Sequence, residues 1–275
     1  MRPARLLVFA ALLLQACSPT QFAYENADVF LRWQANSYFD FQGEQSEELD
    51  RRIAAFLDWH RKHALPQYAR IAEEAGRRML RGINRADLEW GYDVFRAQIG
   101  EALGAAAAEM GPMLDRLKPE QITHIEQRFA DENRKFAREQ LQGTVEERRK
   151  RRLKRSLSRL EDWFGTLSDA QAARVGRYVE RSPLFAELRD RDRRRRQAEL
   201  SAMIRAREAK QRLVKWTVAW DEGREPAYAA AARADRAEYF DLLLELDGTL
   251  SQAQREHAAA RLRDYGNTFD ALQRR

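Results

Sequence analysis

Apolar residues recur at intervals of three and four positions along most of this chain. One series is Leu153, Leu157, Leu160, Phe164 and Leu167. This spacing places the side chains on one face of an α-helix. No stretch alternates apolar and polar residues for long enough to predict a β-strand. We therefore predict an all-α fold without a β-sheet.

Helix start and stop signals, such as proline, glycine and capping residues, divide the chain into a series of helices. We expect them at about residues 21–39, 43–64, 66–81, 84–110, 118–142, 145–165, 168–181, 183–221, 225–247 and 251–272. Pro66 is expected to kink or split the second helix region, and Gly143 before Thr144 indicates a helix end followed by a new start. The alanine-rich stretches 105–108 and 229–232 should permit close helix packing. Short links predict a mostly antiparallel bundle, extended or two-lobed.

One local pattern marks four helix starts: an apolar residue, a potential cap, two further residues and then glutamine. It occurs at residues 41–45, 117–121, 167–171 and 250–254, with close variants at 84–87 and 144–147. A Ser, Thr or Asn cap accepts a backbone N–H, and the side chain three positions later bonds back to the cap. Gln42 and Lys118 are poor caps, so two of the four starts are imperfect.

The N-terminus has the pattern of an export signal. Arg2 and Arg5 precede the apolar run 6–14, which is too short to span a bilayer. Leu14-Gln15-Ala16-Cys17 resembles the lipobox of bacterial lipoproteins. That resemblance implies cleavage after residue 16 and lipidation of Cys17, the only cysteine.

The expected organisation is therefore a signal peptide at 1–16, a lipidated cysteine and short tether at 17–20, and a helical domain at 21–275. Ser18 stands where many lipoproteins of the inner membrane carry aspartate. By that resemblance we expect an outer-membrane protein anchored on the periplasmic face. The short tether should hold the folded body close to the bilayer.

Composition supports a folded helical protein: 44% of residues are hydrophobic, 33% are charged, and glycine and proline are few. The formal net charge is +6, and two segments, 146–155 and 189–196, are strongly basic. Because residues 189–197 contain no apolar side chain, that helical segment must project into solvent or bridge two packed regions.

These basic segments are the candidate ligand site. We predict an anion-binding patch formed by Arg148, Arg149, Arg151, Arg152, Arg193, Arg194, Arg195 and Arg196. Guanidinium groups bind phosphates and carboxylates well, so an anionic lipid or another envelope protein is the expected partner. The alternative is pairing within each helix with nearby carboxylates on a solvated face, namely those of Asp190, Asp192, Glu146 and Glu147. Export makes nucleic acid an unsuitable partner.

No catalytic or metal-binding motif is present. Lipidation would consume the only thiol, and the chain has neither a Gly-x-Ser-x-Gly elbow nor a phosphate-binding glycine loop. His60 and His63 lie three positions apart, but no further ligand accompanies them, and His60 continues an apolar stripe. We predict no enzymatic activity, no cofactor and no metal.

The six tryptophans are expected to lie mostly in the core.

Several longer segments resemble a family of uncharacterised lipoproteins of Gram-negative bacteria. They read NADVFLRW, FDFQGEQSEELDRRI, WHRKHALPQYA, LKPEQITHIEQRFADENRKF and RLEDWFGTLSDAQ. The resemblance covers the mature chain and implies a helical fold and an envelope location, without an activity. The four glutamine motifs more weakly resemble the repeated Leu-Thr-x-x-Gln motifs of small periplasmic stress proteins.

Two functions follow from these observations. The first is a non-enzymatic binding or scaffold module, anchored by lipid and facing the periplasm. The alternative is a periplasmic chaperone-like holdase. A concave apolar face rimmed by arginines would favour the holdase, whereas a compact polar exterior with one patch would favour a dedicated partner.

Overall fold

The computed structural model describes residues 19–274, which are helical apart from short connections and contain no strand. The all-α prediction is confirmed. The helices are α2 (Pro19–Glu25), α3 (Ala27–Phe39), α4 (Glu44–Trp59), the π-helical turn η1 (His60–Ala64), α5 (Leu65–Arg81), α6 (Arg85–Leu114), α7 (Pro119–Phe136), the π-helical turn η2 (Ala137–Leu141), α8 (Val145–Phe164), α9 (Asp169–Arg181), α10 (Ala186–Arg205), α11 (Ala209–Val218), α12 (Pro226–Asp247) and α13 (Gln252–Gln273).

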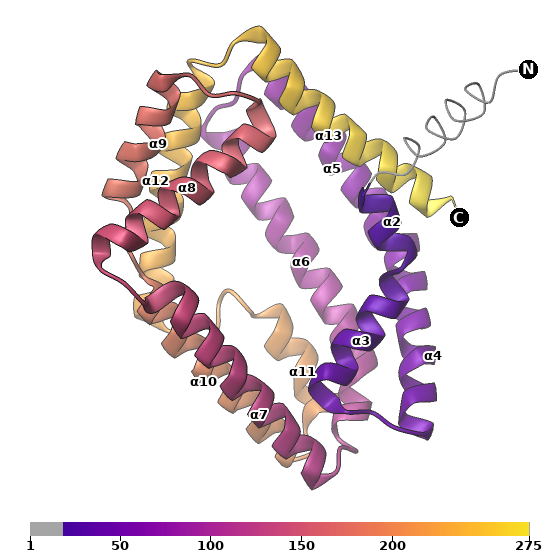
Figure 1. Cartoon of the computed structure of the whole chain (residues 1–275). Helices are drawn as coiled ribbons and strands as arrows, with labels where there is room; N and C mark the ends of the chain where they lie inside the picture. The colour runs from indigo at the N-terminus through magenta and orange to yellow at the C-terminus, as the bar shows by residue number, and fades with distance from the viewer. Residues whose placement is uncertain (1–18, 275) are drawn as a thin grey trace, which may run out of the picture.

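Figure 1 shows these helices arranged as a four-sided frame rather than a simple bundle. Helices α5 and α13 pack along one side, and α7 and α10 pack along the opposite side. Helix α6 runs across the frame with α11 against it.

Two separate hydrophobic cores lie in this frame. The first centres on Leu49, Ile125 and Ile204 and joins α4, α6, α7, α10 and α11. The second centres on Val175 and Leu246 and joins α8, α9, α12 and α13. The structure is thus two-lobed, and α10 extends from the first core towards α12 of the second. Residues 189–197, which contain no apolar side chain, lie in the part of α10 that connects the two lobes.

The helix pair with the most extensive contact, α5 with α13, is not predicted by the alanine runs. Its contact is built from small residues: a Cβ added to Gly76 would lie 3.7 Å from the carbonyl oxygen of Ala259, and one added to Gly266 would lie 3.6 Å from that of Ala69. Of the two expected runs, 105–108 includes Ala107, which is buried in the first core. The run 229–232 instead borders an open hollow.

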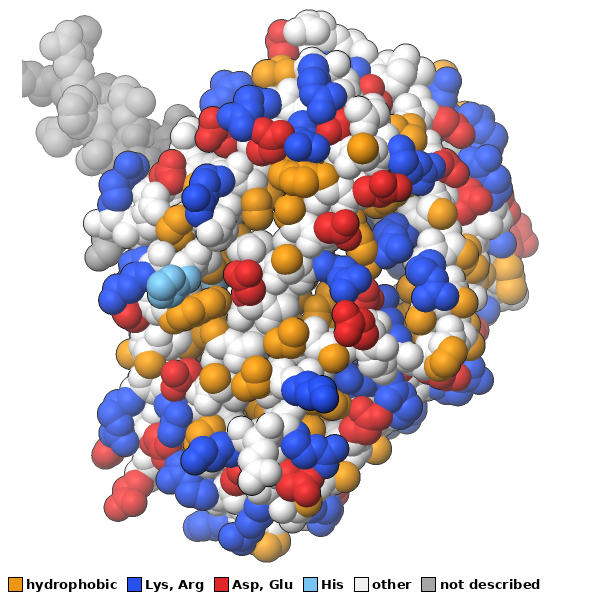
Figure 2. Space-filling model, turned by 180° about the vertical axis from the view of Figure 1, so that it is seen from behind, with side chains coloured by type: hydrophobic (Ala, Val, Ile, Leu, Met, Phe, Trp, Pro, Cys, Tyr) orange, Lys and Arg blue, Asp and Glu red, His pale blue; other side chains and the backbone are white. Residues whose placement is uncertain are grey.

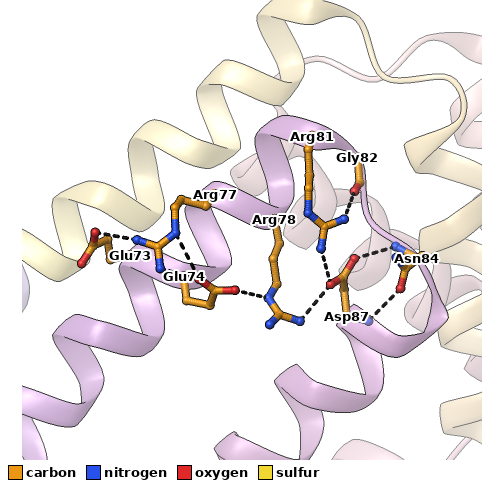
Figure 3. Close-up of polar contacts among 8 residues, drawn as sticks. All are labelled: Glu73, Glu74, Arg77, Arg78, Arg81, Gly82, Asn84 and Asp87. Carbon is orange, nitrogen blue, oxygen red and sulfur yellow. Dashed lines mark hydrogen bonds and ion pairs between the residues drawn. The ribbon is translucent and has the colours of Figure 1, made fainter.

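The predicted helix starts are confirmed at four positions, where Asn84, Thr144, Ser168 and Ser251 form complete capping boxes. At Asn84 the box is reinforced by arginines from α5 (Figure 3). Asp87 accepts from the backbone of Asn84 at 3.0 Å, and from Arg78 and Arg81 at 2.9 and 2.7 Å. As expected, Lys118 provides no side-chain cap, and α4 begins after Gly43 without one.

Two junctions show how prediction and structure differ. Before Pro66 the chain passes through η1 without a break, and Leu65 N–H bonds to the carbonyl of His60. The single helix expected at 183–221 is wrong: it is interrupted at residues 206–208, where Arg207 has a φ of 58°. Asp115, which follows α6, accepts the N–H groups of Ala209 and Lys210 and so caps the start of α11.

Candidate functional site

The predicted lipidation site, Cys17, and the predicted signal at 1–16 lie outside the described residues. Within residues 19–274, no helix is both long and apolar enough to cross a membrane. The prediction of a lipid anchor therefore rests on the sequence.

The first predicted arginine segment lies on α8 and is bonded to neighbouring elements. Arg148 pairs with Glu187 at the start of α10. Arg152 pairs with Asp235 of α12 and donates to the Tyr178 hydroxyl at 2.7 Å.

Two further members of this segment bond to carbonyl oxygens, and Arg149 also forms an ion pair with the Glu180 carboxylate at 3.6 Å. Arg149 donates to the carbonyls of Val179 and Glu180 at the end of α9. Arg151 donates to the carbonyl of Gln142 at 2.5 Å. These two arginines fix the chain on either side of α8.

The second predicted segment lies on α10 and forms the bridge between the lobes. Arg193 and Arg194 both bond to Asp190, at 2.9 and 2.7 Å. Because burial opposes its charge but these two arginines outweigh that effect, the pKa of Asp190 is lowered.

The last two arginines of this segment bond α10 to α11 and the loop after it. Arg195 pairs with Asp192 at 2.6 Å and also donates to the carbonyl of Gly223. The guanidinium of Arg196 stacks 3.7 Å from the centre of the Trp216 ring and donates to the Trp216 carbonyl. The expected pairing with Asp190 and Asp192 is thus present, on a helix whose two aspartates are buried rather than solvated.

The eight predicted arginines do not form one patch. The structure instead brings part of the first segment together with unpredicted residues around a cavity of about 260 Å³, between η2, α8, α10 and α12. The lining residues are Phe136, Gln140, Arg148, Arg152, Arg155, Ser156, Arg159, Tyr178, Leu184, Phe185, Ala186, Arg189 and Asp235. We call this the arginine cavity.

Three arginines of this cavity have no ion-pair partner. Within the part of the chain that the structure describes, Arg155, Arg159 and Arg189 each lie beyond ion-pair distance of any carboxylate. The one carboxylate in the lining, Asp235, is engaged by Arg152. The cavity therefore has a surplus of positive charge.

Two ionisable groups at or beside the cavity, Arg152 and Glu187, are stabilised in their charged forms by their partners. Burial alone would lower the pKa of Arg152, but its bonds to Tyr178 and Asp235 raise it above its usual range. Burial would raise the pKa of Glu187, yet Arg148 lowers it.

On the face of the molecule drawn in Figure 2, basic and acidic side chains are interspersed, so the positive surplus is not a property of that whole surface.

A wider hollow of about 880 Å³ adjoins the arginine cavity and shares Arg159, Phe185 and Arg189 with it. Its lining is rich in aromatic side chains, namely Tyr92, Phe95, Tyr178, Phe185, Trp220, Tyr228, Tyr239 and Phe240. Arginines border it, and Arg236 stacks 4.0 Å from the centre of the Tyr92 ring. An anion in the cavity would thus lie beside a region suited to apolar or aromatic groups.

The histidine pair does not form a metal site in the structure. Among residues 19–274, no group of three His, Cys, Asp or Glu side chains is placed to hold a metal ion. His60 packs against Phe56 and Tyr68, and its Nδ1 lies 3.1 Å from the Tyr24 hydroxyl. Burial lowers the pKa of His60.

The arginines that the sequence interpretation missed carried a readable signal. Arg148, Arg152, Arg155 and Arg159 follow one another at intervals of four, three and four, which places them on one face of α8. A net charge summed over residues 146–155 does not reveal this face, because the sum ignores helical spacing and excludes Arg159. Arg189, which opposes it from α10, could be located only from the tertiary structure.

The sequence pattern of a family of unknown function, DUF6279, matches residues 37–218. The chain belongs to this family. The match begins in α3 and ends with α11, so it includes all five arginines of the cavity but not Asp235 on α12. No curated protein and no solved structure matches the chain.

Proposed function

We propose that this member of DUF6279 is a lipid-anchored protein of the bacterial envelope that binds an anionic ligand in the arginine cavity without transforming it. The observation that carries this proposal is the grouping of Arg155, Arg159 and Arg189 around a cavity without carboxylate partners. The ligand group is a phosphate or a carboxylate, because a guanidinium bonds to either through two parallel N–H donors.

Paired arginines around the cavity favour a preformed site. Arg148 and Arg152 are held by Glu187 and Asp235, so their positions do not depend on a ligand. Their charge is offset by these carboxylates, whereas the three unpaired arginines supply the surplus positive charge and offer free donors. Because the paired arginines are already fixed in position, less conformational entropy is lost when a ligand binds to the unpaired ones.

The envelope location is supported by the sequence around Cys17. The charged start, the apolar run and Leu14-Gln15-Ala16-Cys17 are the features of a lipoprotein signal, and Ser18 favours transfer to the outer membrane. Two or more acyl chains hold a protein to a bilayer far more firmly than one. A phosphate or carboxylate of a periplasmic or envelope component is therefore within reach of the cavity.

Titration with small anions tests the binding site. The lipid-free domain is titrated with inorganic phosphate and with citrate, and heat is measured by calorimetry. We expect binding that Arg155→Ala with Arg159→Ala weakens at least tenfold. The matched control is Lys150→Ala with Lys154→Ala, which removes the same charge from the exposed side of α8 and should leave affinity within about twofold. Equal losses in both variants, or no binding to the unaltered protein, would contradict the proposal.

A second function, the holdase, is favoured by the hollow beside the cavity. Its aromatic lining and bordering arginines form a concave apolar face of the kind expected for that activity. Suppression of aggregation of an unfolding client, measured by light scattering, tests it. Phe95→Ser should reduce suppression, because Phe95 is 61% exposed within the hollow, whereas Leu80→Ser, at an exposed site outside it, should not.

A further inference from the structure

The first helical region, α2 with α3, has two apolar faces. One face contributes Leu31, Ala35 and Phe39 to the packing around the first core. The other face remains exposed. It consists of Phe22, Val29, Phe30 and Trp33, whose exposed fractions are 65%, 62%, 58% and 62%.

Helical geometry gathers these four side chains into one stripe. Phe22, Val29 and Trp33 are separated by seven and four positions, and Phe30 lies one position from Val29. Asn26 N–H bonds to the carbonyl of Phe22, which keeps α3 in line with α2. The rings of Phe30 and Trp33 lie 6.0 Å apart. We call this surface the aromatic stripe.

The aromatic stripe contradicts the expectation that the tryptophans lie mostly in the core. Trp33 is exposed, and the other five are only partly buried. Four large apolar side chains are exposed together on a helical region whose opposite face is already packed. Such a surface is typical of an interaction site. Trp and Phe are typical of the apolar face of helices that lie in the plane of a membrane surface.

The chain before α2 indicates what covers the stripe. Cys17 precedes the first residue of α2 by only two positions in the sequence, and two residues of chain span at most about 7 Å. An acylated Cys17 would hold the start of α2 at the bilayer surface. The stripe begins at Phe22, only three positions beyond that start, so its first side chain would lie near the lipid.

We propose that the aromatic stripe docks into the membrane surface, so that α2 and α3 lie along the bilayer as a second attachment beside the lipid anchor. The inference rests on the lipid anchor of the proposed function and adds the orientation of the bound protein. In Figure 1, α2 and α8 stand at opposite sides of the frame. The docked face and the arginine cavity are then separate surfaces on opposite sides of the frame.

The test uses the full-length acylated protein, because acylation leaves no other cysteine to compete with a label. Val29→Cys is labelled with an environment-sensitive fluorophore, and the protein is reconstituted into vesicles of phosphatidylethanolamine and phosphatidylglycerol that contain nitroxide-labelled lipid. Val145→Cys is the matched control, since it is the same substitution at a similarly exposed site on α8. Flotation and mass spectrometry establish acylation and membrane attachment independently.

We expect the probe at position 29 to be quenched at least threefold more strongly than the probe at 145, with a blue-shifted emission. Protein that floats with the vesicles while both probes respond alike would overturn the docking proposal and leave the anchor intact. Protein that is neither acylated nor floats would overturn the anchor itself, and docking with it.

Discussion

Gln171 and Gln254 exchange two side-chain hydrogen bonds, each 3.0 Å long, between the starts of α9 and α13. Each amide oxygen also accepts the backbone N–H of its own cap, Ser168 or Ser251. Gln45 and Gln121 form the corresponding pair between α4 and α7, at 3.3 and 3.0 Å. The four glutamine motifs of the sequence are therefore two reciprocal pairs, one in each lobe.

This pairing predicts a role in stability. Gln171 is buried, and Gln171→Leu would leave the Ser168 N–H and the Gln254 amide without their partner. We expect a loss of about 2 kcal/mol of unfolding free energy, measured by urea denaturation. Gln252→Leu, at an exposed site in the first turn of α13, is the control and should change it by less than about 0.5 kcal/mol. Equal effects would contradict a structural role for the pair.

The contact of α6 with α11 predicts opposite effects for two glycine substitutions in one helix. A Cβ on Gly111 would lie 3.0 Å from the Cα of Lys210 and 3.1 Å from the carbonyl oxygen of Ala209, both backbone atoms. Gly111→Ala should therefore destabilise the protein by about 1–3 kcal/mol. Gly91→Ala meets no atom within 4 Å and should stabilise it by about 0.5–1 kcal/mol. Thermal denaturation of both variants measures this, and a stabilised Gly111→Ala variant would contradict the close packing.

The junction of α5 with α6 predicts how stability depends on pH. Burial would raise the pKa of Asp87, but the backbone N–H of Asn84 and the guanidinium groups of Arg81 and Arg78 lower it below its usual value near 4. A lowered pKa in the folded state adds stability above the unfolded-state pKa. That stability is lost as the pH falls through the folded-state pKa.

Asp87→Asn should accordingly be less stable than the unaltered protein at pH 7, by about 1.5–3 kcal/mol. The difference should shrink as the pH falls below about 4. Urea denaturation between pH 7 and pH 3 measures it. Glu89→Gln removes an exposed carboxylate from the same helix and should follow the unaltered protein throughout. A constant difference for Asp87→Asn across this range would show that the carboxylate charge is not what stabilises the junction.

The proposed lipid anchor predicts the behaviour of one further variant. Cys17→Ser in cells should abolish acyl labelling and release the protein from the membrane fraction, because the thioether-linked lipid can no longer form. Labelling with a clickable fatty acid and fractionation measure the two effects. Membrane retention of an unlabelled Cys17→Ser protein at the unaltered level would contradict the anchor as the main attachment.

Most of the fold was predictable because its determinants are local. Caps such as Asn84, Thr144 and Ser251 bond within their own first turn, so sequence spacing reveals them. The break between α10 and α11 was not predictable, because its cap is Asp115, which is 94 residues from Ala209 in the chain. Without a glycine or proline at 206–208, the sequence there reads as continuous helix.

The candidate site was predictable only in part for the same reason. The arginine-rich segments are visible in the sequence, but which arginines are neutralised depends on distant carboxylates. Asp235 engages Arg152 from 83 residues away, whereas Arg155, three positions further along α8, meets no carboxylate among the described residues. Counting charge along the chain cannot separate these two cases.

The most direct test of a dedicated anionic partner is photo-crosslinking from the arginine cavity in cells that produce the acylated protein. A photoreactive residue replaces Gln140 in the cavity lining, and a control replaces exposed Gln127 on α7. We predict one dominant adduct from position 140, identified by mass spectrometry as an envelope component with a phosphate or carboxylate. It should be lost with Arg155→Ala and Arg159→Ala and absent from position 127. The same broad set of adducts from both positions, unaffected by the arginine substitutions, would contradict the account.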